Sequence, residues 1–133
     1  TTMYKIQKNT KHLLVEFEED FDYNTLRMII HHETMLPEYA RMNDIWQISE
    51  HHALVSLDDL ESIASDFQCR CPRNSSRKKT AIVVEQGLTE AIILLWIKKV
   101  ENKVPFEFRV FHTLKEAEEW IGVAESAPHI ALR

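Results

Sequence analysis

The sequence predicts an α/β domain with a mixed, mostly parallel sheet that begins with an antiparallel hairpin. Segments of strand pattern alternate along the chain with segments of helical spacing, two helix starts carry capping signals, and the apolar run "TAIVV" from Thr80 is typical of a buried central strand. Strands that alternate with helices pair in parallel through right-handed crossovers. The predicted order is β-β-α-β-α-β-α-β-α.

The first half of the chain supplies the hairpin, a helix and a strand. Two short segments of strand character are separated by "NT", which predicts an antiparallel hairpin. Leu26, Ile29 and Ile30 then lie on one side of a helix that ends before Pro37. The predicted elements are strands at residues 3–8 and 12–17, a helix at 22–35 and a strand at 44–48.

The second half contains both capping signals. Ser56 followed by Asp59 is an N-cap pattern, and Thr113 with Glu116 forms a second capping box whose helix stops at Gly122. The predicted elements are a helix from residue 56 through 67, a strand at 80–85, a helix at 88–100, a strand at 106–110 and a helix at 113–122. A chain of 133 residues is long enough for one core, so we expect a single domain over residues 1–122 followed by a C-terminal tail, 123–133.

Composition excludes several function classes. The net charge of -5 opposes nucleic-acid binding, and the basic stretch 70–79, "RCPRNSSRKK", lacks the interleaved aromatic residues that such binding uses. We expect a solvated loop there, with an anion, an acidic partner or an anionic lipid surface as the alternative. The apolar run "AIILLWI" is far shorter than the roughly 20 residues of a membrane-spanning helix. Without a secretory signal, and with only Cys69 and Cys71, a cytoplasmic location is expected.

The segments "DIWQISEHHALVSLDDLESIA", "TAIVVEQGLTEAIILLWI" and "FEFRVFHTLKEAEEWIG" resemble the bacterial SpoIIAA-like proteins of the STAS superfamily, a group also labelled STAS/Sec14-like. The similarity runs from Met3 to Gly122. It implies a STAS (SpoIIAA-like) fold that presents a regulatory or ligand-binding surface and catalyses no reaction.

The resemblance also directs attention to a phosphoacceptor. In anti-sigma-factor antagonists of this superfamily, a serine or threonine in an Asp-Ser-x-Gly motif is phosphorylated near a strand-helix junction. The comparable position here is Ser49, which follows Ile48 and precedes Glu50, so both the aspartate and the glycine are missing. Ser49 is therefore only a weak phosphoacceptor candidate. Ser56, the other nearby hydroxyl, is explained by its capping role.

Two histidine pairs suggest an alternative function, a metal- or acid-base-dependent enzyme. His31-His32 and His51-His52, with Glu33 and Glu50 beside them, are potential metal ligands. Neighbouring residues point in different directions on a helix or a strand, so a site would need one histidine from each pair. The enzyme alternative would use His51, His52, Glu50 and perhaps His31 at the strand-helix junction.

No catalytic or cofactor motif supports that alternative. The chain has no G-x-S-x-G, no H-E-x-x-H and no glycine-rich phosphate loop, since Gly87 and Gly122 are its only glycines. Cys69 and Cys71 do not form a Cys-x-x-Cys redox motif, although their basic surroundings would favour a thiolate. We assign no catalytic residue, no metal and no cofactor.

The apolar helix at 88–100 is the most suggestive feature. It carries one stripe of Leu88, Ala91, Ile92 and Leu95 and another of Ile93, Trp96, Ile97 and Val100, more than a single sheet face can cover. The surplus completes the core, forms a homodimer interface, or contacts a protein partner or an apolar, lipid-like molecule. We predict a binding domain whose contact residues are Ile93, Trp96 and Ile97, with Met35, Tyr39 and Met42 as a lid.

Overall fold

The structure, a computed structural model, describes residues 3–71 and 78–122. In chain order its elements are β1 (Tyr4–Lys8), β2 (His12–Phe17), β3 (Phe21–Asp22), α1 (Tyr23–Thr34), β4 (Asn43–Ser49), β5 (Ala53–Leu54), α2 (Leu57–Arg70), β6 (Lys79–Val84), α3 (Leu88–Val100), β7 (Glu107–Phe111) and α4 (Leu114–Gly122). Every predicted strand and helix is present. The predicted tail, 123–133, and most of the basic stretch, 72–77, lie outside the described residues.

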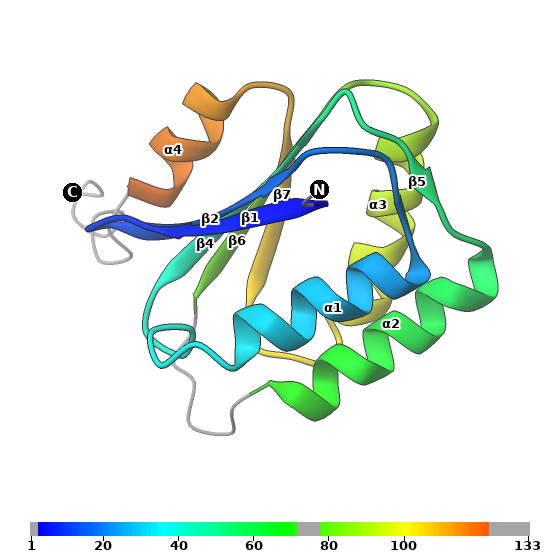
Figure 1. The fold of residues 1–133 in the computed structure, drawn as a ribbon, viewed down its shortest axis with the longest axis horizontal. Helices are drawn as coiled ribbons and strands as arrows, with labels where there is room; N and C mark the ends of the chain where they lie inside the picture. Colours follow the sequence, from blue (N-terminus) through cyan, green and yellow to red (C-terminus); the bar gives the residue numbers. More distant parts are fainter. Residues whose placement is uncertain (1–2, 72–77, 123–133) are drawn as a thin grey trace, which may run out of the picture.

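Five strands form the main sheet in the order β1-β2-β4-β6-β7. β1 runs antiparallel to β2, and the other three pairings are parallel, which confirms the predicted mixed α/β fold. The sequence did not predict β3 and β5. These two strands, each of two residues, pair in parallel and form a separate small sheet. This small sheet lies beside the carboxyl ends of the central strands (Figure 1).

The sheet separates two layers of unequal size. Among the described helices, α1, α2 and α3 cover one face and α4 packs on the other (Figure 1). Alternation along β4 divides its side chains, so that Trp46 joins the large core and Ile45 joins the small core under α4. Of the elements in residues 3–71 and 78–122, only α4 covers this second face, and it contacts β4, β6 and β7.

Local signals account for the helix starts. The Asp22 carboxylate accepts the N–H of Thr25 at 2.9 Å and caps α1. Both hydrogen bonds of the predicted capping box between Ser56 and Asp59 form at the start of α2. α3 has no side-chain cap, because its N-cap is Gly87 with φ of 138°, a backbone conformation that disfavours any side chain.

Two residues of the basic stretch do not lie in a solvated loop, which corrects that expectation. Lys78 and Lys79 are only 3% and 7% exposed, and both ammonium groups bind backbone carbonyls. Lys78 donates to the Tyr39 carbonyl at 3.0 Å, and Lys79 donates to the Trp120 carbonyl at 3.1 Å. These lysines therefore fix loops and helices to the start of β6.

Candidate functional site

The carboxyl end of β4 makes a tight turn at Ser49. This serine has φ of 54°, in the left-handed region, and the pairing of β4 with β6 shifts register between Gln47 and Ser49. The N–H of His51 bonds back to the Ile48 carbonyl at 3.2 Å, and the N–H of Glu85 donates to the Ser49 carbonyl at 3.2 Å. The predicted phosphoacceptor is thus a half-buried residue in a strained turn.

His51 and His52 both face Asp20, which precedes β3. The Asp20 Oδ1 atom accepts the backbone N–H of His52 at 2.8 Å and lies 3.4 Å and 3.9 Å from the Nδ1 atoms of His52 and His51. The His52 N–H bond, followed by the two nearby imidazoles, lowers the pKa of Asp20. Across residues 3–71 and 78–122, no three histidine, cysteine or acidic side chains form a metal-binding group.

The other histidine pair lies in the last turn of α1, and its two members contact different residues. His31 Nδ1 is 2.5 Å from an Arg70 guanidinium nitrogen, and His32 Nδ1 is 3.2 Å from the Tyr4 hydroxyl. Twelve helical residues span roughly 18 Å, and His51-His52 lies beyond the opposite end of α1. The structure therefore does not bring together one histidine from each pair, the arrangement that a metal site built from both pairs would need.

A buried ionisable cluster instead occupies the amino ends of β4 and β6. Glu33 and Asp44 are each 1% exposed, although the sequence suggested Glu33 only as a partner of His31-His32. Trp46 Nε1 donates to Glu33 Oε1 at 3.1 Å, and the Thr80 hydroxyl donates to Asp44 Oδ1 at 2.6 Å. Glu33 Oε2 is buried and has no donor.

A proton on Glu33 Oε2 accounts for this geometry. Burial, then the charge of Asp44 and a side-chain hydrogen bond to it, raise the pKa of Glu33 well above its ordinary value. A protonated Glu33 donates that hydrogen bond to Asp44, so two buried carboxyl groups carry one negative charge. The Lys78 ammonium, 3.9 Å from Asp44 Oδ1, balances that charge. The cluster can hold a proton, but its burial excludes a substrate.

One of the three predicted lid residues, Tyr39, lies against this cluster. Tyr39 is 1% exposed, and its ring centroid lies 3.4 Å from Lys78 Nζ. Burial is the main cause that raises the pKa of the Tyr39 phenol, which stays neutral. Met42 packs against the core, whereas Met35 is 70% exposed. Of the three predicted lid residues, Tyr39 is therefore buried, Met42 half-buried and Met35 exposed.

The contact residues predicted on α3 face inward. Ile93, Trp96 and Ile97 are between 4% and 7% exposed and belong to the large core. The helix does leave apolar surface uncovered, on its other stripe, where Leu88 is 76% exposed and Leu95 46%. The sequence identified the surplus but not which stripe enters the core.

A small apolar cavity lies between the sheet and the helices α1, α2 and α3. Ala53, Val55, Ile92, Ile93 and Trp96 contribute to its lining, which exposes no polar surface. Its volume of about 10 Å³ is too small for an ordered water with polar partners. Trp96 Nε1 is buried without a hydrogen-bond partner.

The roof of this cavity is thin. Phe21 and Ala53, paired in the β3-β5 sheet, are both lining residues. The Ala53 N–H donates to the Thr89 hydroxyl at 3.1 Å, which joins β5 to the first turn of α3. Two-residue strands and the uncapped start of α3 therefore lie beside this part of the core.

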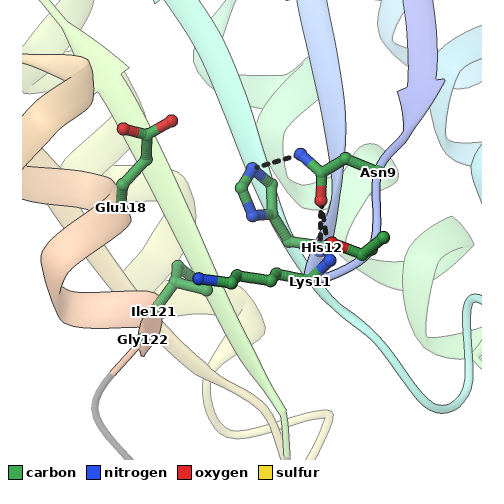
Figure 2. Close-up of a pocket in the computed structure, with 7 residues that line it drawn as sticks. Asn9, Lys11, His12, Glu118, Ile121 and Gly122 are labelled. Atoms are coloured by element: carbon green, nitrogen blue, oxygen red, sulfur yellow. Dashed lines mark hydrogen bonds between the residues drawn. The ribbon is translucent and has the colours of Figure 1, made fainter.

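A larger polar groove lies on the opposite side of the sheet, between the β1-β2 turn and α4 (Figure 2). It has a volume of about 670 Å³ and is lined by Asn9, Thr10, Lys11, His12, Glu118, Ile121 and Gly122. His12 is 7% exposed, and burial lowers its pKa, against the opposing charges of Glu118 and Asp44. This groove was not predicted from the sequence, in which its one signal is a histidine at the first position of a buried strand.

Two further predictions concern residues outside these sites. Cys69, exposed, and Cys71, half-buried, remain thiols rather than a disulfide. None of the helices within the described ranges combines the length and apolar character needed to cross a membrane.

Comparisons with known proteins bear on the fold alone. No family model and no curated protein matches the chain. Among solved structures, the chain is similar to an uncharacterised protein from Shewanella loihica PV-4, described as belonging to the DUF3478 family and having a SpoIIAA-like fold. The two are 19% identical, the match covers 89% of this chain and 91% of that one, and the TM-score is 0.48.

Proposed function

We propose that the protein is a non-enzymatic binding domain that takes an apolar, lipid-like ligand between α3 and the sheet. The observation that carries the proposal is the unpartnered Trp96 Nε1 in a core region with a wholly apolar cavity. Burial of an N–H group without an acceptor lowers the free energy of unfolding, because the group loses its hydrogen bond to water and gains none in the apolar core. A ligand that supplies the acceptor recovers that cost.

The chemistry of the cavity defines the ligand class. Apolar walls favour a hydrocarbon chain or ring. The Trp96 N–H is not exposed in the closed cavity, but once ligand entry opens it this donor would bind one acceptor, such as a carbonyl or carboxyl oxygen. The lining provides no charged group for a phosphate or a sugar. A fatty acid, or a related molecule with one oxygen acceptor, fits this pattern.

Binding requires the roof to move, because the cavity is almost closed. Its weakest part is the two-residue pairing of β3 with β5 together with the first turn of α3. Leu54 on β5 and Leu88 on α3 flank this part and are 63% and 76% exposed. Displacement of the roof would join these leucines to the apolar lining, so a long chain could extend outward along them.

Uptake of the fluorescent probe N-phenyl-1-naphthylamine, and its displacement by a fatty acid, tests the proposal. Ala53→Leu adds a side chain inside the cavity, and we expect it to reduce uptake at least tenfold while the far-UV spectrum is unchanged. Ala91→Leu is the matched control, because Ala91 is exposed on the outer side of α3. Equal uptake by the wild type and both variants would reject the cavity as the site.

A second variant tests the role of the indole N–H. Trp96→Phe keeps an aromatic ring but removes the donor, so we expect a fatty acid to lose its advantage over a hydrocarbon of equal length. Without ligand, the variant should lose only the free energy of unfolding that corresponds to the smaller ring, because the replaced N–H makes no hydrogen bond. An unchanged preference for the fatty acid would contradict the ligand class.

Exposed leucines favour a second candidate, a protein partner that includes a second copy of the chain. Leu88, Leu94 and Leu95 are each at least 46% exposed along α3. Sedimentation of the wild type beside a Leu88→Ser, Leu95→Ser double variant tests this candidate. A dimer lost in the double variant would support it, and a monomer in both would leave the apolar ligand as the function proposed for α3.

A further inference from the structure

The turn between β1 and β2 fixes the orientation of one buried histidine. Asn9 Oδ1 accepts the backbone N–H groups of Lys11 and His12, each at 2.8 Å. The carboxamide is therefore oriented with its NH₂ group toward His12 Nε2, 3.3 Å away. Because an NH₂ group only donates, Nε2 accepts, and the proton of the neutral imidazole lies on Nδ1.

That imidazole is a directed donor. Figure 2 shows the side chain of His12 in the gap between the turn and α4. The residue as a whole is only 7% exposed. No described residue accepts a hydrogen bond from its Nδ1. Within the described residues, the buried side-chain atoms without a partner are Glu33 Oε2 and Trp96 Nε1, so His12 Nδ1 is reached by solvent. It borders a groove of about 670 Å³ and is free to donate to a molecule there.

The two walls of the groove carry opposite charges that do not pair. Lys5 and Lys8 on the same hairpin form ion pairs with Glu18 at 3.3 Å and Glu38 at 2.8 Å. Lys11, beside the groove, makes no ion pair within the described residues. Glu118 on α4 likewise has no ionic partner there, although its charge acts on His12. The groove thus has two donors on the turn and one acceptor on the helix.

We propose that this groove binds a small zwitterion that carries a carboxylate and an ammonium group, of which a free α-amino acid is the simplest. Lys11 and the Nδ1–H of His12 bind the carboxylate, Glu118 binds the ammonium, and Ile121 contacts the side chain. The volume falls within the range of known small-molecule pockets, about 300–1,000 Å³. This site is separate from the apolar cavity, from which the sheet divides it.

Titration of the ¹⁵N-labelled full chain with each of the common L-amino acids tests the proposal, with acetate and ethylamine as fragments that carry one charge each. We expect at least one amino acid to shift the His12 ring and the amide signals of residues 9–12 and 118–122, with neither fragment binding as tightly. Hydrogen bonds to charged groups are strong enough that losing one weakens binding about tenfold or more.

Two variants separate the arms of the site. Glu118→Gln should weaken amino-acid binding about tenfold and leave acetate unaffected, whereas Lys11→Met should weaken both. Glu119→Gln, a neighbouring change outside the groove lining, is the control and should change neither. The proposal fails if no amino acid binds below about 10 mM, if acetate binds as well as any amino acid, or if both groove variants bind normally. Probe uptake by the apolar cavity should be unaffected throughout.

Discussion

The two edges of the parallel sheet place their ionisable groups in opposite environments. At the carboxyl edge, Asp20 meets His51 and His52, whose side chains are 23% and 71% exposed. At the amino edge, Glu33, Asp44 and Lys78 are each no more than 3% exposed. The histidines that suggested chemistry in the sequence thus lie at least partly exposed, whereas Glu33, Asp44 and Lys78 lie in the core.

This difference shows that the neighbours of a buried charged group neutralise its charge and occupy its hydrogen-bonding positions. Such a group is then not free to bind a substrate. Asp44 accepts a hydrogen bond from the Thr80 hydroxyl, lies 3.9 Å from the Lys78 ammonium and is adjacent to Glu33, whose pKa is raised. The histidine junction needs no such balance, because water solvates it. We therefore interpret the amino edge as a structural cluster and the carboxyl edge as the start of the roof over the apolar cavity.

The largest expected effect comes from breaking the buried cluster. Asp44→Ala leaves the Lys78 ammonium and the Glu33 proton without their shared partner, and should lower the free energy of unfolding by about 3–5 kcal/mol. Urea denaturation measures this loss. Asp20→Ala at the exposed edge is the comparison and should cost far less. Similar losses in the two variants would contradict the contrast between the edges.

A smaller effect distinguishes the protonated Glu33 from an ionised one. Its pKa is raised in the folded protein, so its stabilising contribution is complete below the ordinary carboxyl pKa and is lost as pH rises through the raised pKa. The loss amounts to at most about 1.4 kcal/mol per pH unit.

Glu33→Gln tests this directly, because a glutamine amide accepts from Trp46 and donates to Asp44 as the protonated acid does. We expect the variant to match the wild type at acid pH and to lack its decline in stability at higher pH. Denaturation curves over that pH range provide the measurement. Parallel pH profiles for the two proteins would show that Glu33 is not the titrating group.

The smallest effect belongs to the turn at Ser49. A left-handed backbone conformation costs a non-glycine residue about 1 kcal/mol, so Ser49→Gly should stabilise the protein by about that amount. Ser49→Ala keeps the strain and serves as the control for loss of the hydroxyl. A glycine variant no more stable than the alanine variant would mean that the turn is unstrained.

The sequence predicted the main elements because each carries a long local signal. Capping at Ser56, the alternation in 106–110 and the continuous run in 80–85 are all visible without tertiary contacts. β3 and β5 were not predicted, because a strand of two residues is too short to show an alternating pattern of apolar and polar side chains. Their pairing depends on contacts between segments about 30 residues apart.

The sites were predicted less well, because helical spacing defines stripes but not which of them enters the core. On α3 both stripes are apolar, and only packing decides that Trp96 is buried and Leu95 exposed. One usable signal was overlooked: Glu33 continues the buried stripe of Ile29 and Ile30 at helical spacing. A carboxylate in an apolar stripe predicts a buried, partnered acid.

Mass spectrometry of freshly purified protein under native and then denaturing conditions tests the central claim most directly. The claim predicts a stoichiometric excess of mass in the native spectrum that disappears on denaturation and matches an apolar molecule with an oxygen acceptor. Delipidated protein should regain such a mass when a fatty acid is added. A clean apo mass both before and after that addition would contradict ligand binding at the cavity beneath α3.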